Sequence, residues 1–328
     1  MNPAPQLYPA PARKSGVYSA RAGWCRVKVL YAGDSEAGGP ANYLLGILKS
    51  LKADCAHIPP GKKLSPSLFK TQFDVILLSD FSRRDTPLEA EKAIVSQAEK
   101  GAGLLMIGGW ASFSGPFGGW RGSLIEKILP VRCLPRDDRL PLPGGAWVTP
   151  SPLSSPPGRG RGEGEGEASC PFFPNHWFKN PPVICGLNQI HPKKGSLVLL
   201  TARKISPPLT LSPQGRGKGE GWEYPLLIIH SDPTQRIAAL ATDLAPHWCG
   251  GLVDWGEKRI KIRVRGKIGI EVGDCYVRFV SNLLRWLAGP EPSYSAKELK
   301  GLNQLHKDEK KKGWIRLKTA EDINNLLL

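Results

Sequence analysis

The sequence has no apolar run long enough to cross a bilayer. No stretch of its 328 residues reaches the ~18 consecutive apolar residues that a membrane-spanning helix needs. Residues 1–23 are rich in Pro, Ala and Ser and have no apolar core, which argues against a secretory signal. We therefore expect a cytoplasmic protein, in which residues 1–24 are a disordered extension or reflect an upstream start-codon choice.

Paired cysteines and nucleotide-binding glycine motifs are also missing. The seven cysteines are scattered without a C-x-x-C pair, which argues against a disulfide framework and against a zinc site. Neither G-x-x-x-x-G-K-[ST] nor, after the first apolar segment, G-x-G-x-x-G is present. We therefore expect no metal and no ATP, dinucleotide or other cofactor.

Short apolar runs alternate with amphipathic segments along most of the chain. Strands are predicted at 27–32, 54–58, 73–79, 104–107, 197–202, 226–230 and 237–242, and helices at 41–51, 87–100 and 276–288. This alternation is typical of an α/β protein whose mostly parallel sheet is covered on both faces. We predict a flavodoxin-like, doubly wound domain over residues 25–290, followed by a polar basic tail at 291–328.

Two low-complexity segments interrupt this domain. Residues 155–164 nearly repeat at 212–221, and both copies consist of Gly, Pro, Ser and charged residues. Such a composition cannot bury a core. We interpret residues 151–168 and 206–221 as disordered inserts from a translated mobile repeat; the alternative is a nucleic-acid-binding segment of the RG type.

The stretch from Gly101 to Val131 carries a family resemblance. Its apolar run at 104–107 ends in Gly108-Gly109-Trp110, and the segments 73–81, 241–248 and 282–289 fit the same pattern. Together they resemble the putative glutamine amidotransferase family, a divergent branch of the class I glutamine amidotransferase-like superfamily. The resemblance covers roughly residues 27–289 and implies the fold of that superfamily.

The resemblance also implies a catalytic arrangement that this sequence lacks in part. Class I amidotransferases attack glutamine with a Cys on the turn after a central strand, assisted by a later His and a carboxylate. That turn holds Gly108 and Gly109 here, whereas His247 and Asp243 lie near the positions of the His and its partner. Ser112 is a candidate replacement nucleophile or a loop hydrogen-bonding residue.

The predicted strand ends bring several polar and aromatic residues to one edge of the sheet. Ligands bind at such edges in open α/β sheets. The predicted pocket consists of Asp34, Ser35, Asp80, Gly108, Gly109, Trp110 and Trp248. The alternative is that the aspartates cap helices or bind loop amides.

A formal net charge of +16 raises the question of a polyanionic partner. Lys261, Arg263 and Arg265 alternate with apolar residues, which predicts a hairpin with a basic outer face. We expect weak, non-specific nucleic-acid binding at most, because no stacking aromatic residue alternates with these cations.

Our leading interpretation is a ligand-binding or assembly module without the Cys nucleophile, for an unknown small molecule or protein. The alternatives are a hydrolase or amidotransferase with a relocated nucleophile that uses His247, and a polyanion-binding protein that uses the hairpin.

Overall fold

The structure is a computed structural model that describes residues 27–35, 39–151, 172–173, 175–205, 223–230, 232, 234–264 and 269–289. The predicted N-terminal extension, the insert at 206–221 and the basic tail lie outside the described residues, as does the insert at 151–168 apart from Ser151. Arg265 lies outside them as well.

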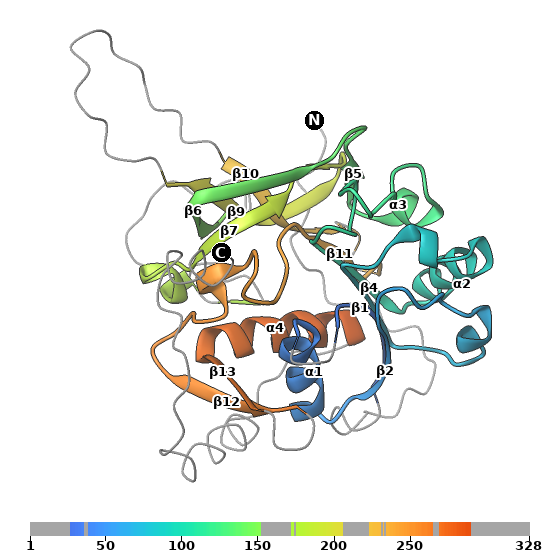
Figure 1. Ribbon diagram of the computed structural model, residues 1–328, viewed down its shortest axis with the longest axis horizontal. Coiled ribbons are helices and arrows are strands. Elements are labelled where there is room, and N and C mark those ends of the chain that lie inside the picture. The colour runs from blue at the N-terminus through green and yellow to red at the C-terminus, as the bar shows by residue number, and fades with distance from the viewer. Residues whose placement is uncertain are drawn as a thin grey trace, which may run out of the picture.

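A mixed sheet forms the centre of the described molecule (Figure 1), with the strand order β2-β1-β3-β4-β11-β10-β9-β6-β7. Its strands are β1 (Lys28–Gly33), β2 (Asp54–Ile58), β3 (Val75–Ser79), β4 (Gly103–Ile107), β6 (Arg139–Pro150), β7 (Val183–Asn188), β9 (Ser196–Lys204), β10 (Glu223–His230) and β11 (Ile237–Leu240). The strands from β2 to β11 in this order pair in parallel, and those from β11 to β7 pair antiparallel.

The parallel half has the strand order of flavodoxin-like proteins, in which the first strand lies between the second and the third. The predicted α/β fold class is therefore confirmed. The antiparallel half extends this sheet on the far side of β11 and was not predicted as a unit.

Helices cover both faces of the parallel half. Helix α1 (Ala41–Ser50) packs beside α4 (Asp274–Ala288), whereas α2 (Leu88–Glu99) packs beside the short α3 (Leu124–Ile128) on the other face (Figure 1). Every residue of β3 and β4 is buried as a result. This double coverage explains why these strands are apolar throughout instead of alternating with polar residues.

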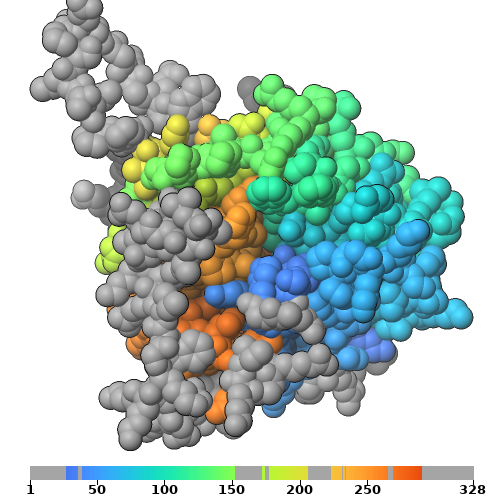
Figure 2. Space-filling view, in the orientation of Figure 1, coloured from blue at the N-terminus to red at the C-terminus, as the bar shows by residue number. Residues whose placement is uncertain are grey.

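The predicted basic hairpin is present as β12 (Arg259–Arg263) and β13 (Gly269–Gly273). Ile260 and Ile262 are buried against the domain, as the alternation predicts. Ile262 reaches α1 at Gly46, where a Cβ atom would lie 2.6 Å from the isoleucine Cγ2. In the space-filling view, the orange C-terminal segment accordingly emerges beside the blue segment that contains α1 (Figure 2).

Smaller elements complete the described structure. Strands β5 (Val131–Cys133) and β8 (Ile190–Pro192) form a separate antiparallel pair. Short 3-10 helices lie at Pro66–Lys70, Arg83–Asp85, Asn175–Lys179 and Gly250–Leu252. Within the described ranges, no helix has the length and apolar character needed to cross a membrane.

Candidate functional site

Adjacent parallel strands end at one edge of the sheet and deliver acidic and glycine residues there. Asp34 follows β1, Asp80 follows β3, the pair Gly108-Gly109 follows β4, and Asp243 lies shortly after β11. Both Asp34 and Asp80 have a left-handed backbone, with φ of 47° and 50°. Aspartate tolerates this conformation better than most residues. The strand order reverses between β1 and β3, which is where ligands bind in such sheets.

The turn after β4 has no room for a side chain at Gly109. A Cβ atom at this position would lie 2.5 Å from Oδ1 of Asp80. The same Oδ1 accepts a hydrogen bond of 2.5 Å from the backbone N–H of Ala111. The Asp80 carboxylate therefore occupies the space beside the turn where the family resemblance implies a cysteine. Burial raises the pKa of this carboxyl above its usual value.

The hydroxyl of Ser112 is buried and fully engaged. It accepts a hydrogen bond of 3.1 Å from the backbone N–H of Asp80 and donates one of 2.5 Å to the carbonyl of Ile107. These bonds tie the loop to the ends of β3 and β4. The geometry matches the loop hydrogen-bonding alternative for Ser112, whose hydroxyl proton is donated to the Ile107 carbonyl.

A buried amide that sequence reasoning missed holds the Gly109 turn. The side chain of Asn188, at the end of β7, makes two hydrogen bonds with Gly109. Its Oδ1 accepts one of 2.9 Å from the Gly109 N–H, and its Nδ2 donates one of 3.2 Å to the Gly109 carbonyl. Its Nδ2 also donates to Oδ1 of Asp138 at 2.7 Å. The other oxygen of Asp138 accepts the Ser114 N–H at 2.7 Å, and burial raises the pKa of Asp138 to about 6.

The candidate base His247 lies at the surface beside Asp243. Its Nδ1 is 3.8 Å from Oδ2 of Asp243, which is too far for a hydrogen bond. Both oxygens of Asp243 are occupied by the N–H groups of Trp248, at 3.0 Å, and Cys249, at 2.6 Å. The carboxylate thus closes the loop that carries the histidine.

The electrostatics of this loop follow from burial. Burial, reinforced by repulsion from Asp34 and Asp80, raises the pKa of Asp243 to about 8. Partial burial lowers the pKa of His247, although Asp80 opposes this shift. The imidazole is therefore neutral near pH 7 and could accept a proton.

The described cysteines are free thiols, and two of them contact the loop that carries His247: the Cys249 N–H donates to Asp243, and the Cys185 N–H donates to the Trp248 carbonyl. Cys249 is fully buried and donates through Sγ to the Ala245 carbonyl at 2.7 Å. Burial raises the pKa of both Cys249 and Cys185, and Asp243 reinforces both shifts. Thiols of this kind are poor nucleophiles because the thiolate is the reactive form.

The aromatic residues of the predicted pocket differ in their surroundings. Trp110 is 43% exposed, and the guanidinium carbon of Arg139 lies 4.2 Å from its ring centroid. The His247 ring is near both tryptophans: its centroid lies 6.4 Å from that of Trp110 and 6.1 Å from that of Trp248, to which it is nearly parallel. Trp248 itself is buried.

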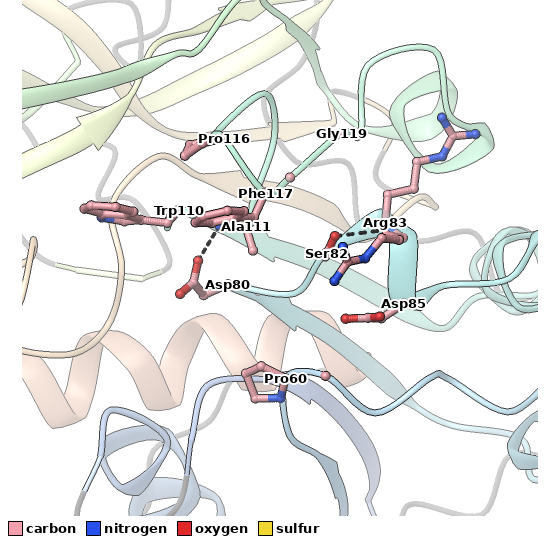
Figure 3. A pocket seen from close by; sticks show the side chains of 13 residues that line it. Pro60, Asp80, Ser82, Arg83, Asp85, Trp110, Ala111, Pro116, Phe117 and Gly119 are labelled. Carbon is pink, nitrogen blue, oxygen red and sulfur yellow. Dashed lines mark hydrogen bonds between the residues drawn. The ribbon is translucent and has the colours of Figure 1, made fainter.

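A groove of about 670 Å³ opens beside Asp80 (Figure 3). Its walls come from the loops after β2 and β3 and from the Gly-rich loop after β4. It is lined by Pro60, Gly61, Asp80, Ser82, Arg83, Arg84, Asp85, Trp110, Ala111, Pro116, Phe117, Gly118 and Gly119. Of the predicted pocket residues, Asp80 and Trp110 line this groove. The others, Asp34, Ser35, Gly108, Gly109 and Trp248, do not, and Ser35 is an exposed residue before α1.

The basic hairpin carries acidic partners that the alternation pattern did not reveal. Arg259 forms ion pairs with Asp254, at 2.5 Å, and with Glu271 on the facing strand, at 3.0 Å. Glu271 is also the register partner of Lys261, and Arg263 is exposed near the end of β12. Anywhere in the described part of the chain, no group of three or more His, Cys, Asp or Glu residues could hold a metal ion.

Comparison with known proteins agrees with the fold and with the family resemblance. Residues 70–155 match the family model described as "Putative glutamine amidotransferase", which confirms the family resemblance over this region. The matched region runs from β3 to β6 and includes Gly108 and Gly109, whereas Asp243 and His247 lie outside it. Among curated proteins, none matches this chain.

Two solved structures share the fold. Cytoplasmic Protein STM3548 from Salmonella typhimurium is 21% identical with a TM-score of 0.54, over 79% of this chain and 98% of that chain. Cytoplasmic Protein STM1381 from Salmonella typhimurium LT2 is 21% identical with a TM-score of 0.52, over 80% and 99% of the two chains. The chain therefore shares its α/β fold with these two proteins and is similar to the glutamine amidotransferase-like family over residues 70–155.

Proposed function

We propose that this protein is a ligand-binding module on a glutamine amidotransferase-like scaffold, without a thiol nucleophile at the turn after β4. The observation that carries the proposal is the position of the Asp80 carboxylate, 2.5 Å from the place where a Cβ atom of residue 109 would lie. A site that had merely lost its cysteine would leave an empty space there. Here the space is filled by a group that also lines an open groove.

The geometry of the candidate substitutes supports the same proposal. Ser112 is buried in two hydrogen bonds, and Cys249 is buried against a carbonyl. The alternative, a hydrolase that uses His247, retains a neutral imidazole but gains no nucleophile from these residues. The polyanion alternative is weakened by the acidic partners of Arg259.

A cytoplasmic location is part of the proposal. Both Salmonella proteins that share the fold are described as cytoplasmic. Fluorescence microscopy and cell fractionation of the tagged protein would test it.

Ammonia release from L-glutamine tests the proposed loss of chemistry. We expect background rates for the wild-type protein and for His247→Ala alike, because no thiolate is available at the turn. A wild-type rate well above background that disappears in His247→Ala would contradict the proposal and favour the hydrolase alternative. A size-exclusion profile and a thermal melt of both proteins control for misfolding.

A further inference from the structure

The groove beside Asp80 exposes two large aromatic side chains at its mouth. Phe117 is 63% exposed and Trp110 is 43% exposed, although most large apolar side chains of the described molecule are buried. Both rings lie above Asp80, with Pro60 on the opposite side of the groove (Figure 3). Aromatic rings exposed together beside a concave surface are typical of a binding site.

Hydrogen bonds of its backbone and of the Trp120 side chain hold the loop that carries these rings in place. The Phe117 N–H donates to the Trp110 carbonyl at 3.1 Å, and Gly118 joins the neighbouring wall by accepting from the Arg83 N–H at 3.0 Å. Inside the loop, the buried Trp120 donates through Nε1 to the Phe81 carbonyl at 3.0 Å. The backbone that carries the exposed rings is therefore held in position, which lowers the entropic cost of binding.

The charged groups of the groove nearly cancel. Arg83 pairs through Nε with Oε1 of the buried Glu91 at 2.6 Å, so its charge is neutralised within the protein. Among the residues that the structure describes, no ion pair or hydrogen bond engages the side chain of Arg84 or of Asp85. Together with Asp80, these groups offer carboxylate acceptors and guanidinium donors without the excess of positive charge that a phosphate ligand requires.

From this combination we propose that the groove binds a neutral saccharide; the inference rests on the proposed ligand-binding function. The apolar C–H face of a sugar ring would stack on Phe117 and Trp110. Its hydroxyl groups, which both donate and accept, would donate to Asp80 and Asp85 and accept from Arg84. A groove of about 670 Å³ has the size of a site for a ligand of one or two rings.

A glycan array of neutral mono- and oligosaccharides, followed by calorimetric titration of the sugars that bind, tests this proposal. We expect at least one neutral saccharide to bind the wild-type protein. Phe117→Ala and Trp110→Ala should each weaken that binding about tenfold, since each removes a stacking surface. Trp147→Ala is the matched control, because Trp147 is 40% exposed on β6 and does not line the groove. It should bind as the wild-type protein does.

One further variant examines the polar contacts without changing the net charge. The double variant Arg84→Gln/Asp85→Asn should also weaken saccharide binding, and thermal melts should show that all variants fold. The absence of saccharide binding, or binding that survives both aromatic substitutions, would overturn the proposal.

Titration with L-glutamine and with AMP distinguishes failure of the saccharide proposal from failure of the proposed ligand-binding function. Binding of either probe that requires Phe117 and Trp110, without saccharide binding, would leave a ligand-binding module of another specificity. Ammonia release from glutamine would instead contradict the proposed function itself.

Discussion

Gly109 is the residue at which the backbone and a neighbouring carboxylate together exclude any side chain. We expect Gly109→Ala to lower the free energy of unfolding by about 2–3 kcal/mol, because the new methyl group would overlap the Asp80 side chain. Urea denaturation measures this loss. Gly122→Ala is the control: its φ is +75°, but no atom lies within 4 Å of the new Cβ, so it should cost only about 1 kcal/mol.

A double-mutant cycle identifies Asp80 as the cause. Asp80 has a φ of 50°, so Asp80→Gly suits the backbone and removes the overlapping atoms. In the Asp80→Gly background, Gly109→Ala should lower the free energy of unfolding by clearly less than it does in the wild-type protein. Equal costs in the two backgrounds would show that the carboxylate does not fill the space beside the turn.

Asp34 should make the stability depend on pH. Burial, with repulsion from Asp80, raises its pKa to about 6, although Oδ2 accepts a hydrogen bond of 2.6 Å from the Tyr31 hydroxyl. The unfolded chain has a carboxyl pKa near ~4. The folded state therefore binds the proton more tightly, and ionisation of Asp34 costs stability as the pH rises from about 4 to 6.

Asp34→Asn removes this ionisation and retains an oxygen that can accept from Tyr31. Relative to the wild-type protein, the variant should gain on the order of 1–2 kcal/mol between pH 5 and pH 8. Denaturation at the two pH values measures the difference. If the free energy of unfolding of Asp34→Asn differs from that of the wild-type protein by the same amount at both pH values, Asp34 ionises normally in the folded protein.

At the residue scale, sequence reasoning found the groups that come directly after apolar strands. Asp34, Asp80 and the glycine pair are of this kind, because a strand end is visible in the pattern. Asp138 and Asn188 are not. They come from the loop before β6 and from the end of β7, and their meeting depends on a long-range pairing that no local pattern records.

At the scale of elements, the strands of the parallel half were predicted within about two residues, since each is a short apolar run between turn residues. The missed strand β6 contains Pro141, Pro143 and Pro150 together with two glycines, which normally indicate a loop. The structure accommodates Pro143 and the two glycines through a break in the register: Pro141 pairs with Gly186, and the pairing with β7 resumes only at Ala146. A break of this kind removes the need for the missing proline N–H groups.

The connection between the two halves of the sheet can be tested at Asn188. Asn188→Ala should lower the free energy of unfolding by about 2–4 kcal/mol, because it leaves the buried Gly109 N–H and a buried oxygen of Asp138 without partners. Asn188→Asp supplies the comparison. It places a second carboxyl against Asp138. The free energy of unfolding of Asn188→Asp should therefore fall further below that of Asn188→Ala as the pH rises from 5 to 8. A loss below about 1 kcal/mol for Asn188→Ala would mean that the amide does not hold the turn.

At the scale of the whole molecule, the two halves of the sheet have different parts in the site. The parallel half brings Asp80 and the Gly-rich loop to the groove, as in other open α/β sheets. The antiparallel half does not line the groove, yet Asn188 at the end of β7 holds the turn behind it. We therefore expect that a substitution that destabilises the antiparallel half also disorders the turn behind the groove.

The pairing of β9 with β10 predicts that residues 206–221 are dispensable for folding. Arg203 and Glu223 are direct register partners on these antiparallel strands, so a turn of a few residues is long enough to connect them. We expect a variant in which an Asn-Gly turn replaces residues 206–221 to fold with a melting temperature within about 3 °C of the wild-type value, because the ladder on either side is unchanged. The variant should also retain the ligand binding of the groove, which lies at the other half of the sheet. Replacing residues 197–202 of β9 by the same turn is the control and should abolish folding. Loss of folding in the first variant would show that the segment contributes contacts to the domain rather than only length.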